Sequence, residues 1–164
     1  MSDFQTPPDV CEFMMSLIPP PVFFDGFVLE PTKGEGNIVR ALEARGYGVV
    51  APDDFFNSEA VKEHHFRVTV MNPPFSPMKL GYKILDRVME ISDYIVAIMP
   101  WLAIINGQKR TDKIMGYGLK QIIHLPRSVF PGARVQTCIL VMVRGWKEQT
   151  TFSVYKRGVV NVNS

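Results

Sequence analysis

The chain has 164 residues, a hydrophobic fraction of 46% and a formal net charge of +2. This length suits one domain with a sizeable core, so we expect residues 1–164 to form a single domain. No apolar run reaches the roughly 20 residues of a membrane span, and we expect no secretion signal. Two cysteines, Cys11 and Cys138, are too few for a disulfide framework, which predicts reduced thiols and a cytoplasmic location.

Charge is divided unevenly along the chain. Residues 1–100 carry 8 Lys and Arg against 14 Asp and Glu, whereas residues 101–164 carry 10 against 2. A basic segment is either an ordinary solvated surface or a surface that binds a polyanion, and charge alone does not distinguish the two. His64, His65 and His124 form no metal-ligand spacing with the cysteines, so no metal site is expected.

Strand-like and helix-like patterns alternate, which favours an α/β domain with a mainly parallel sheet. The segment 126–134 is long enough for a loop but short for a crossover helix, so we expect the last two strands to form an antiparallel pair at the edge of the sheet. The expected elements in chain order are helix 8–18, strand 26–30, helix 35–45, strand 47–51, a weak helix or loop over 57–65, strand 67–71, helix 77–91, strand 93–99, a loop containing Trp101, helix 109–117, strand 119–125 and strand 136–143.

The first expected strand leads into 28-VLEPTKGEG-36, where an acid and a proline precede two glycines at the start of a helix. Gly34 and Gly36 allow the backbone to approach a ligand closely, and the helix N-terminus favours negative groups. Asp53 lies 17 residues after Gly36, about where nucleotide-binding α/β units place a carboxylate on ribose hydroxyls. The spacing suggests a nucleoside-type ligand, although an acid after proline is also a common turn.

The segment 72-NPPF-75 follows an inner strand, which its two prolines end. Open α/β sheets bind ligands at this edge. The Asn72 side-chain carbonyl and the Pro73 main-chain carbonyl can accept both hydrogens of one NH₂ group, which returns electron density to a nitrogen lone pair that is delocalised into a π system. Phe75 can stack on the same planar group. The alternative is a proline-stiffened turn with a core Phe.

The Glu-Pro-x-x-Gly-x-Gly segment, the acids after the second strand and Asn-Pro-Pro-Phe resemble the class I S-adenosylmethionine-dependent methyltransferases that methylate the adenine N6 amino group in DNA. Their order, with 4-FQTP-7 first, resembles the gamma group, and 99–110 and 127–142 resemble compact phage or mobile-element members. The resemblance implies a Rossmann-like fold, a mainly parallel sheet flanked by helices with an antiparallel C-terminal strand. Because the interval from Asp53 to Asn72 is short, one strand–helix unit is expected to be missing.

The resemblance also implies S-adenosylmethionine as cofactor, DNA as substrate and a role for each matching residue. Asn72, Pro73, Pro74 and Phe75 would receive the target base, with Asn72 also close to the cofactor. Asp53 would hold the ribose, and Asp54 or Phe55 would lie near the cofactor's adenine, although the assignment between the two acids stays open. The remaining implied cofactor contacts are Phe4, Thr6, Pro7, Glu30, Pro31, Thr32, Gly34 and Gly36.

Family members usually add a target-recognition domain, for which these residues leave no room. A specificity partner, a homo-oligomer or the basic loops would then direct the chain to DNA. Two other functions stay open, which are methyl transfer to RNA or to a protein glutamine amide, and a non-catalytic cofactor- or DNA-binding accessory role. Candidate phosphate contacts are Lys79, Lys109, Arg110, Lys113, Arg127 and Arg134.

Overall fold

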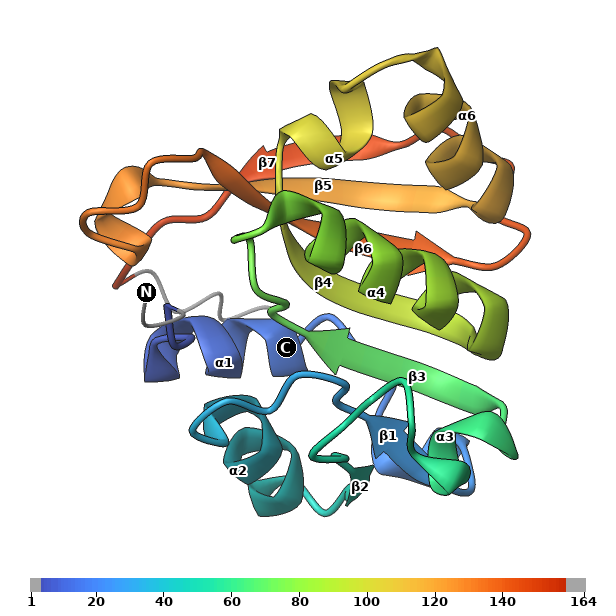
Figure 1. Ribbon diagram of the computed structural model, residues 1–164. Helices are drawn as coiled ribbons and strands as arrows, with labels where there is room; N and C mark the ends of the chain where they lie inside the picture. The colour runs from blue at the N-terminus through green and yellow to red at the C-terminus, as the bar shows by residue number, and fades with distance from the viewer. Residues whose placement is uncertain (1–3, 159–164) are drawn as a thin grey trace.

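The computed structural model describes residues 4–158, which form a seven-stranded sheet with helices on both faces (Figure 1). The strand order is β2-β1-β3-β4-β6-β5-β7. Strand β6 pairs antiparallel with β4 and β5, and the other neighbouring strands pair in parallel. The strands are β1 (Phe27–Leu29), β2 (Gly48–Val50), β3 (Phe66–Met71), β4 (Ser92–Pro100), β5 (Leu119–Leu125), β6 (Thr137–Val143) and β7 (Thr151–Val154).

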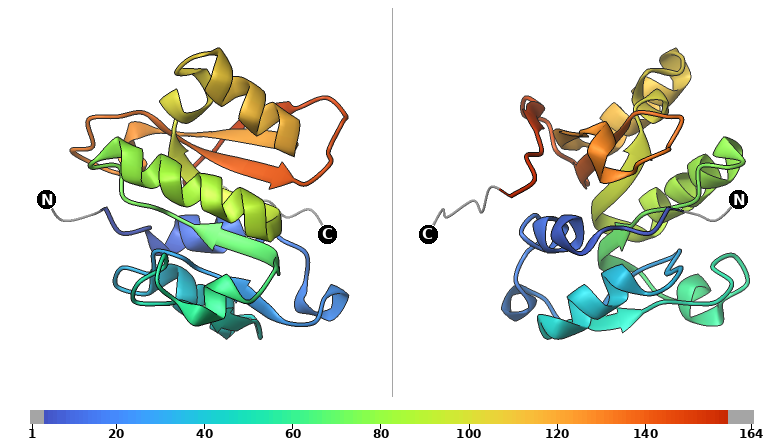
Figure 2. Two further views of the ribbon diagram at one scale, coloured as in Figure 1. Left: turned by 45° about the vertical axis from the view of Figure 1, so that its right-hand side comes forward. Right: turned by 90° about the vertical axis from the view of Figure 1, so that its left-hand side faces the viewer.

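The helices form a layer on each side of the sheet, as the two views of Figure 2 show. Helices α1 and α2 pack on one face together with Val96 and Ile98 of β4, whereas α4 and α6 pack on the other with Ile95 and Ala97. This alternation follows from the two-residue period of a strand that is buried on both faces. The helices are α1 (Pro8–Met15), α2 (Asn37–Ala44), α3 (Glu59–Lys62), α4 (Met78–Ile91), α5 (Leu102–Ile105) and α6 (Gln108–Tyr117), with 3₁₀ turns η1 (Pro21–Phe23) and η2 (Arg127–Val129).

The structure confirms the predicted α/β class, the mainly parallel sheet and the antiparallel pairing of the last two predicted strands. Between β2 and β3 the chain forms α3, a helix of four residues, and within residues 4–158 β2 is an edge of the sheet. One strand–helix unit was expected to be missing between Asp53 and Asn72, and this short connection occupies that position.

Three details of the prediction are wrong. The antiparallel pair is not the edge of the sheet, because β7 pairs in parallel with β5 outside it. All four β7 residues are exposed, so this strand lacks the alternation of buried residues that identifies strands in a sequence. The predicted loop at Trp101 leads directly into α5, and the first helix ends at Met15 rather than at residue 18.

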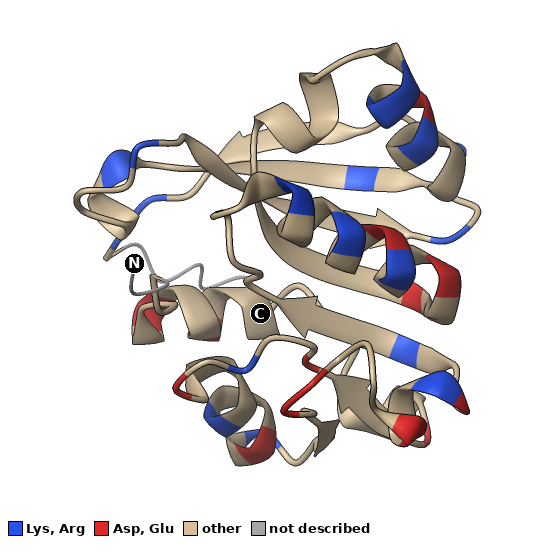
Figure 3. Cartoon of the chain, in the orientation of Figure 1, with Lys and Arg blue, Asp and Glu red and all other residues tan. Residues whose placement is uncertain are grey.

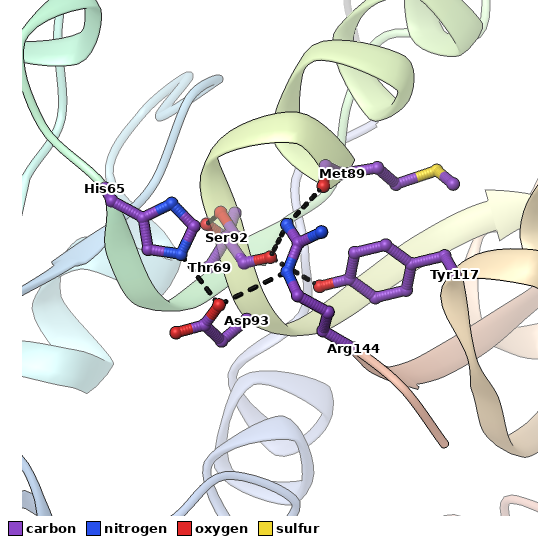
Figure 4. A network of polar contacts seen from close by, with 7 residues as sticks. All are labelled: His65, Thr69, Met89, Ser92, Asp93, Tyr117 and Arg144. Atoms are coloured by element: carbon purple, nitrogen blue, oxygen red, sulfur yellow. Dashed lines mark hydrogen bonds and ion pairs between the residues drawn. The ribbon is translucent and has the colours of Figure 1, made fainter. Parts of the chain in front are cut away.

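A polar network joins α4, β4 and β6 at the end of the sheet where β4 begins (Figure 4). Helix α4 runs into β4 without a linker, and Arg144 caps it by donating from Nη2 to the main-chain oxygens of Met89 at 2.6 Å and Ser92 at 2.7 Å. Asp93 accepts from Arg144 and contacts His65 at 2.7 Å. Two further contacts complete the network, a 2.6 Å bond between the Thr69 and Ser92 hydroxyls and a 2.6 Å bond from Tyr117 to the Ser92 main-chain oxygen.

Both cysteines are free and buried, in agreement with the expected reduced thiols. Burial raises the pKa of Cys11 and that of Cys138 to about 12, so neither is a reactive thiolate near neutral pH. None of the helices within residues 4–158 has the length and apolar character needed to cross a membrane. The same residues contain no cluster of three or more His, Cys, Asp or Glu side chains that could hold a metal ion.

Candidate functional site

A cavity of about 490 Å³ opens at the carboxyl ends of β1, β2 and β3, the edge of the sheet at which open α/β folds bind ligands. The N-terminal segment and the first half of α4 complete its wall. The predicted site residues that line it are Phe4, Thr6, Glu30, Pro31, Thr32, Gly34, Asp53, Asp54, Phe55, Asn72 and Pro74. Segments that are far apart in sequence therefore meet in one place.

Four predicted site residues do not line the cavity. Pro7 immediately precedes α1, and Gly36 is the N-cap of α2 with a φ of +86° that favours glycine. Pro73 is buried, and Phe75 is half-buried against the core that contains α1. The prediction missed several other lining residues, which are Gln5, Lys33, Asn37, Ile38, Pro52, Phe56, Leu80 and Ile84.

The glycine segment lies against the N-terminal segment. Gly34 has a φ of +51°, and a Cβ there would lie 2.8 Å from Gln5 Oε1. That oxygen accepts a hydrogen bond of 3.1 Å from the main-chain nitrogen of Glu35. The positive φ favours glycine at position 34, and the absence of a side chain there leaves room for the Gln5 amide.

Glu30 is a buried acid at the end of β1, with 1% of its surface exposed. Its Oε1 accepts a 2.7 Å hydrogen bond from the main-chain nitrogen of Thr32, and no residue within 4–158 donates to Oε2. Burial raises the pKa of Glu30 to about 7, an effect that outweighs the bonds from Thr32. A carboxyl held in this way beside a cavity is suited to a cationic ligand group, which would draw it into the ionised form.

The two acids after β2 have different partners. Asp53 is exposed and pairs with Lys33, Nζ to Oδ1, at 2.5 Å, which lowers the pKa of Asp53. Asp54 accepts a 2.7 Å hydrogen bond from Asn57 Nδ2, which lowers the pKa of Asp54. Phe55 is buried and contacts Phe56 edge-on, with ring centroids 5.0 Å apart, so this side of the cavity is aromatic.

Asn72 follows the end of β3 and contacts the N-terminal segment. Its Nδ2 donates to the main-chain oxygen of Phe4 at 3.1 Å and to Thr6 Oγ1 at 3.0 Å. Among residues 4–158 no group donates to Asn72 Oδ1. The amide thus has its donors occupied and its acceptor free, which is the arrangement that an incoming N–H group needs.

The turn after Asn72 packs closely on the first half of α4. A Cβ at Gly81 would lie 2.8 Å from the main-chain oxygen of Pro74. Such a distance requires the backbone of one segment to move, so glycine at this position lets α4 support the Asn-Pro-Pro-Phe turn.

The predicted phosphate contacts divide into two groups. Arg110 and Lys113 on α6 both pair with Asp86, at 2.6 and 3.1 Å, so a single carboxylate offsets part of their combined charge. Within residues 4–158, the exposed members that form no ion pair are Lys79, Lys109, Arg127 and Arg134. Figure 3 shows basic residues on the loop between β5 and β6, whereas α4 carries both signs of charge. A basic surface near the carboxyl edge of the sheet therefore rests mainly on that loop and the start of α4.

No protein-family model matches the chain, and no curated protein matches it in sequence. Solved structures do match its fold. A type I restriction-modification methyltransferase subunit from Streptococcus thermophilus is 14% identical with a TM-score of 0.70, over 96% of this chain and 49% of that one. The M protein of the type I restriction enzyme EcoKI is 14% identical with a TM-score of 0.67, over 88% and 44%. A Pyrococcus horikoshii protein assigned as an RNA methyltransferase is 14% identical with a TM-score of 0.63, over 86% of each chain.

These similarities and the strand order establish the fold. The chain has the Rossmann-like α/β fold of class I S-adenosylmethionine-dependent methyltransferases. It spans about half the length of the type I subunits that it matches. The structures similar to it include restriction-modification methyltransferase subunits and a protein assigned as an RNA methyltransferase, so the fold leaves the substrate open.

Proposed function

We propose that this protein transfers a methyl group from S-adenosylmethionine to the N6 amino group of adenine in DNA. The observation that carries the proposal is the free Oδ1 of Asn72, because both recorded contacts of its Nδ2 are with the N-terminal segment. Asn72 lines a cavity that is also lined by the buried Glu30 and by the acids after β2.

The residues that line the cavity fit the cofactor group by group. Glu30 would hold the cationic methionine end, and Gly34 would let the backbone approach it. Both acids after β2 are exposed, but Asp53 is better suited than Asp54 to the ribose hydroxyls, because its partner is a flexible lysine whereas Asp54 is held by Asn57. Phe55 would contact the adenine. S-adenosylmethionine supplies an electrophilic methyl group on its sulfonium.

The chain's own contribution to the reaction is to activate and orient the nitrogen that is methylated. Asn72 Oδ1 would accept a hydrogen bond from one N–H group of the target, and the main-chain oxygen of Pro73, a residue that does not itself line the cavity, would accept one from the other. These bonds favour a pyramidal nitrogen whose lone pair points at the methyl group. As the nitrogen–carbon bond forms, the bond between the methyl carbon and the sulfonium sulfur breaks, and the sulfur leaves as the neutral thioether of S-adenosylhomocysteine. The methylated nitrogen is then cationic and acidic enough to release its proton to water, so no histidine is needed.

DNA is favoured as the substrate by the basic balance of residues 101–164 and by the exposed cations of the β5–β6 loop. The target amino group is inaccessible in a duplex, so the base must be flipped out or offered in a single strand. Contacts to phosphate supply affinity without reading sequence. A partner protein or a second copy of the chain would supply sequence specificity.

The proposal is tested by transfer of labelled methyl from S-adenosylmethionine to methyl-free DNA, RNA and bulk protein. We expect label in DNA, and we expect Asn72→Ala to abolish transfer while cofactor affinity stays within a few-fold of the wild-type value. Cofactor binding without labelling of any substrate would contradict catalysis. Loss of cofactor binding in Asn72→Ala would contradict the role given to Asn72.

RNA is the second candidate substrate, and one observation favours it. The Pyrococcus horikoshii protein that is assigned as an RNA methyltransferase matches this fold over most of both chains. Label in RNA but not in DNA would select this alternative.

A further inference from the structure

The orientation of the Asn72 amide follows from the chemistry of its neighbours. An amide can be reversed without changing its shape, so its oxygen and nitrogen are assigned from their partners. The main-chain oxygen of Phe4, at 3.1 Å, can only accept a hydrogen bond. The atom that faces it must be Nδ2, and Oδ1 must therefore point the other way.

Thr6 supplies the second contact, and its own position is fixed by three other elements. Only 3% of its surface is exposed, and its Oγ1 accepts from Asn72 Nδ2 at 3.0 Å. Its main-chain oxygen accepts a 2.9 Å bond from Asn37 Nδ2 in α2 and a 3.6 Å contact from Cys11 Sγ in α1. The neighbouring Gln5 is bonded to Glu35 in the glycine segment. These contacts hold the main chain of Thr6 in place at the point where its hydroxyl meets Asn72.

We propose that Thr6 is a positioning residue that holds the second N–H of the Asn72 amide, while the main-chain oxygen of Phe4 fixes which end of the amide faces the N-terminal segment. The site then selects a hydrogen-bond-donating nitrogen and disfavours a carbonyl oxygen at the same place. The claim about which substrate group is selected rests on the proposed function, whereas the claim about the orientation of the Asn72 amide does not. Reversal of the amide would turn the Asn72 oxygen toward the Phe4 oxygen and present an NH₂ group to the target. A target NH₂ would then meet a donor in place of an acceptor, and methyl transfer would lose its activating bond.

The substitution Thr6→Val tests this directly, because valine has nearly the shape of threonine but cannot accept the bond from Asn72. Thr6→Ser keeps the hydroxyl. We expect Thr6→Val to lower kcat for DNA about tenfold, the effect of losing one well-placed hydrogen bond. The KM for DNA should change less than threefold, and Thr6→Ser should recover most of the lost rate. Thr69→Val is the matched control, because its buried hydroxyl lies in the same strand that leads to Asn72 but bonds to Ser92.

A second measurement does not depend on turnover. In ¹⁵N-labelled protein, the side-chain NH₂ protons of Asn72 are identified by their loss in Asn72→Ala. Thr6→Val should move one of them upfield, toward the position of a proton without a hydrogen bond, whereas Thr6→Ser and Thr69→Val should not. Unchanged Asn72 resonances in Thr6→Val would overturn the inference.

The two readouts separate this inference from the proposed function. Equal losses of kcat in Thr6→Val and Thr6→Ser would overturn it even if DNA is methylated, because the hydroxyl would then be irrelevant. If wild-type protein methylates no DNA, the proposed function fails. The Asn72 resonances still decide the orientation in that case, with an upfield move in Thr6→Val supporting it.

Discussion

Glu30→Gln is the substitution whose effect can be worked most fully from the structure. Glu30 is buried and accepts hydrogen bonds only from Thr32 among residues 4–158, and its burial raises its pKa from the ordinary value of 4.5 to about 7. Glutamine has nearly the same size, keeps an acceptor for the Thr32 main-chain nitrogen and carries no titrating proton. The change therefore removes the ionisation and leaves most of the packing.

The sign and size of the effect on stability follow from the difference between the pKa of Glu30 in the folded chain and its pKa in the unfolded chain. Between pH 4.5 and 7 the unfolded chain has released the Glu30 proton while the folded chain still holds it, so the free energy of unfolding falls as pH rises. The stabilisation is fully present below pH 4.5 and lost above pH 7. A difference of about 2.5 pKa units, from 4.5 to about 7, corresponds to about 3 kcal/mol at 1.36 kcal/mol per unit. Because glutamine does not titrate, Glu30→Gln does not lose this stability as pH rises.

The assay is urea unfolding of both proteins without cofactor at several pH values from 5 to 8. We expect the stability of Glu30→Gln relative to wild type to rise by about 2–3 kcal/mol across this range. Other groups that titrate in this interval are present in both proteins, so their effects cancel in the difference. A difference that stays constant within about 0.5 kcal/mol would refute the buried, proton-bearing Glu30 on which the cofactor assignment depends.

Three further predictions concern the same fold. As pH increases toward 7, cofactor affinity should rise by up to tenfold per pH unit and then level off above pH 7, because a cationic ligand binds the ionised form of Glu30. Calorimetry in buffers of different ionisation enthalpy should count about one proton released on binding at pH 6. An affinity that does not change with pH would contradict this prediction. Gly81→Ala should cost about 1–3 kcal/mol of stability and most methyl transfer, because its Cβ meets the Pro74 main-chain oxygen at 2.8 Å. Gly116→Ala in α6 is its control, with no atom within 4 Å of the added Cβ, and equal losses in the two variants would reject the argument. Arg144→Met should cost about 1–2 kcal/mol in urea unfolding, since the carbonyls that end α4 lose a charged donor, and a loss below about 0.5 kcal/mol would show that water replaces it.

The site was predictable where a local pattern marks the end of a strand. An acid or an amide directly after an apolar strand identified Glu30, Asp53 and Asn72, and the common direction of β1, β2 and β3 brings those residues to one edge. The order of residues along the chain is enough for this inference, because parallel strands end on the same side of a sheet.

The sequence did not predict the contacts between distant segments. The bonds from Asn72 to Phe4 and Thr6 span 68 and 66 residues, and nothing in the local pattern of either segment indicates them. Phe75 was expected to face the target base, but its half-buried ring packs against the core and does not line the cavity. Strand β7 escaped prediction because an exposed edge strand has no buried face to pattern its residues.

The central claim is tested most directly by nucleoside analysis of methyl-free DNA after incubation with the protein and S-adenosylmethionine. We predict N6-methyladenine in the digest, in an amount that grows with time and is absent when Asn72→Ala replaces the wild-type protein. Wild-type protein that binds the cofactor yet forms no N6-methyladenine in single-stranded or duplex DNA would contradict the claim.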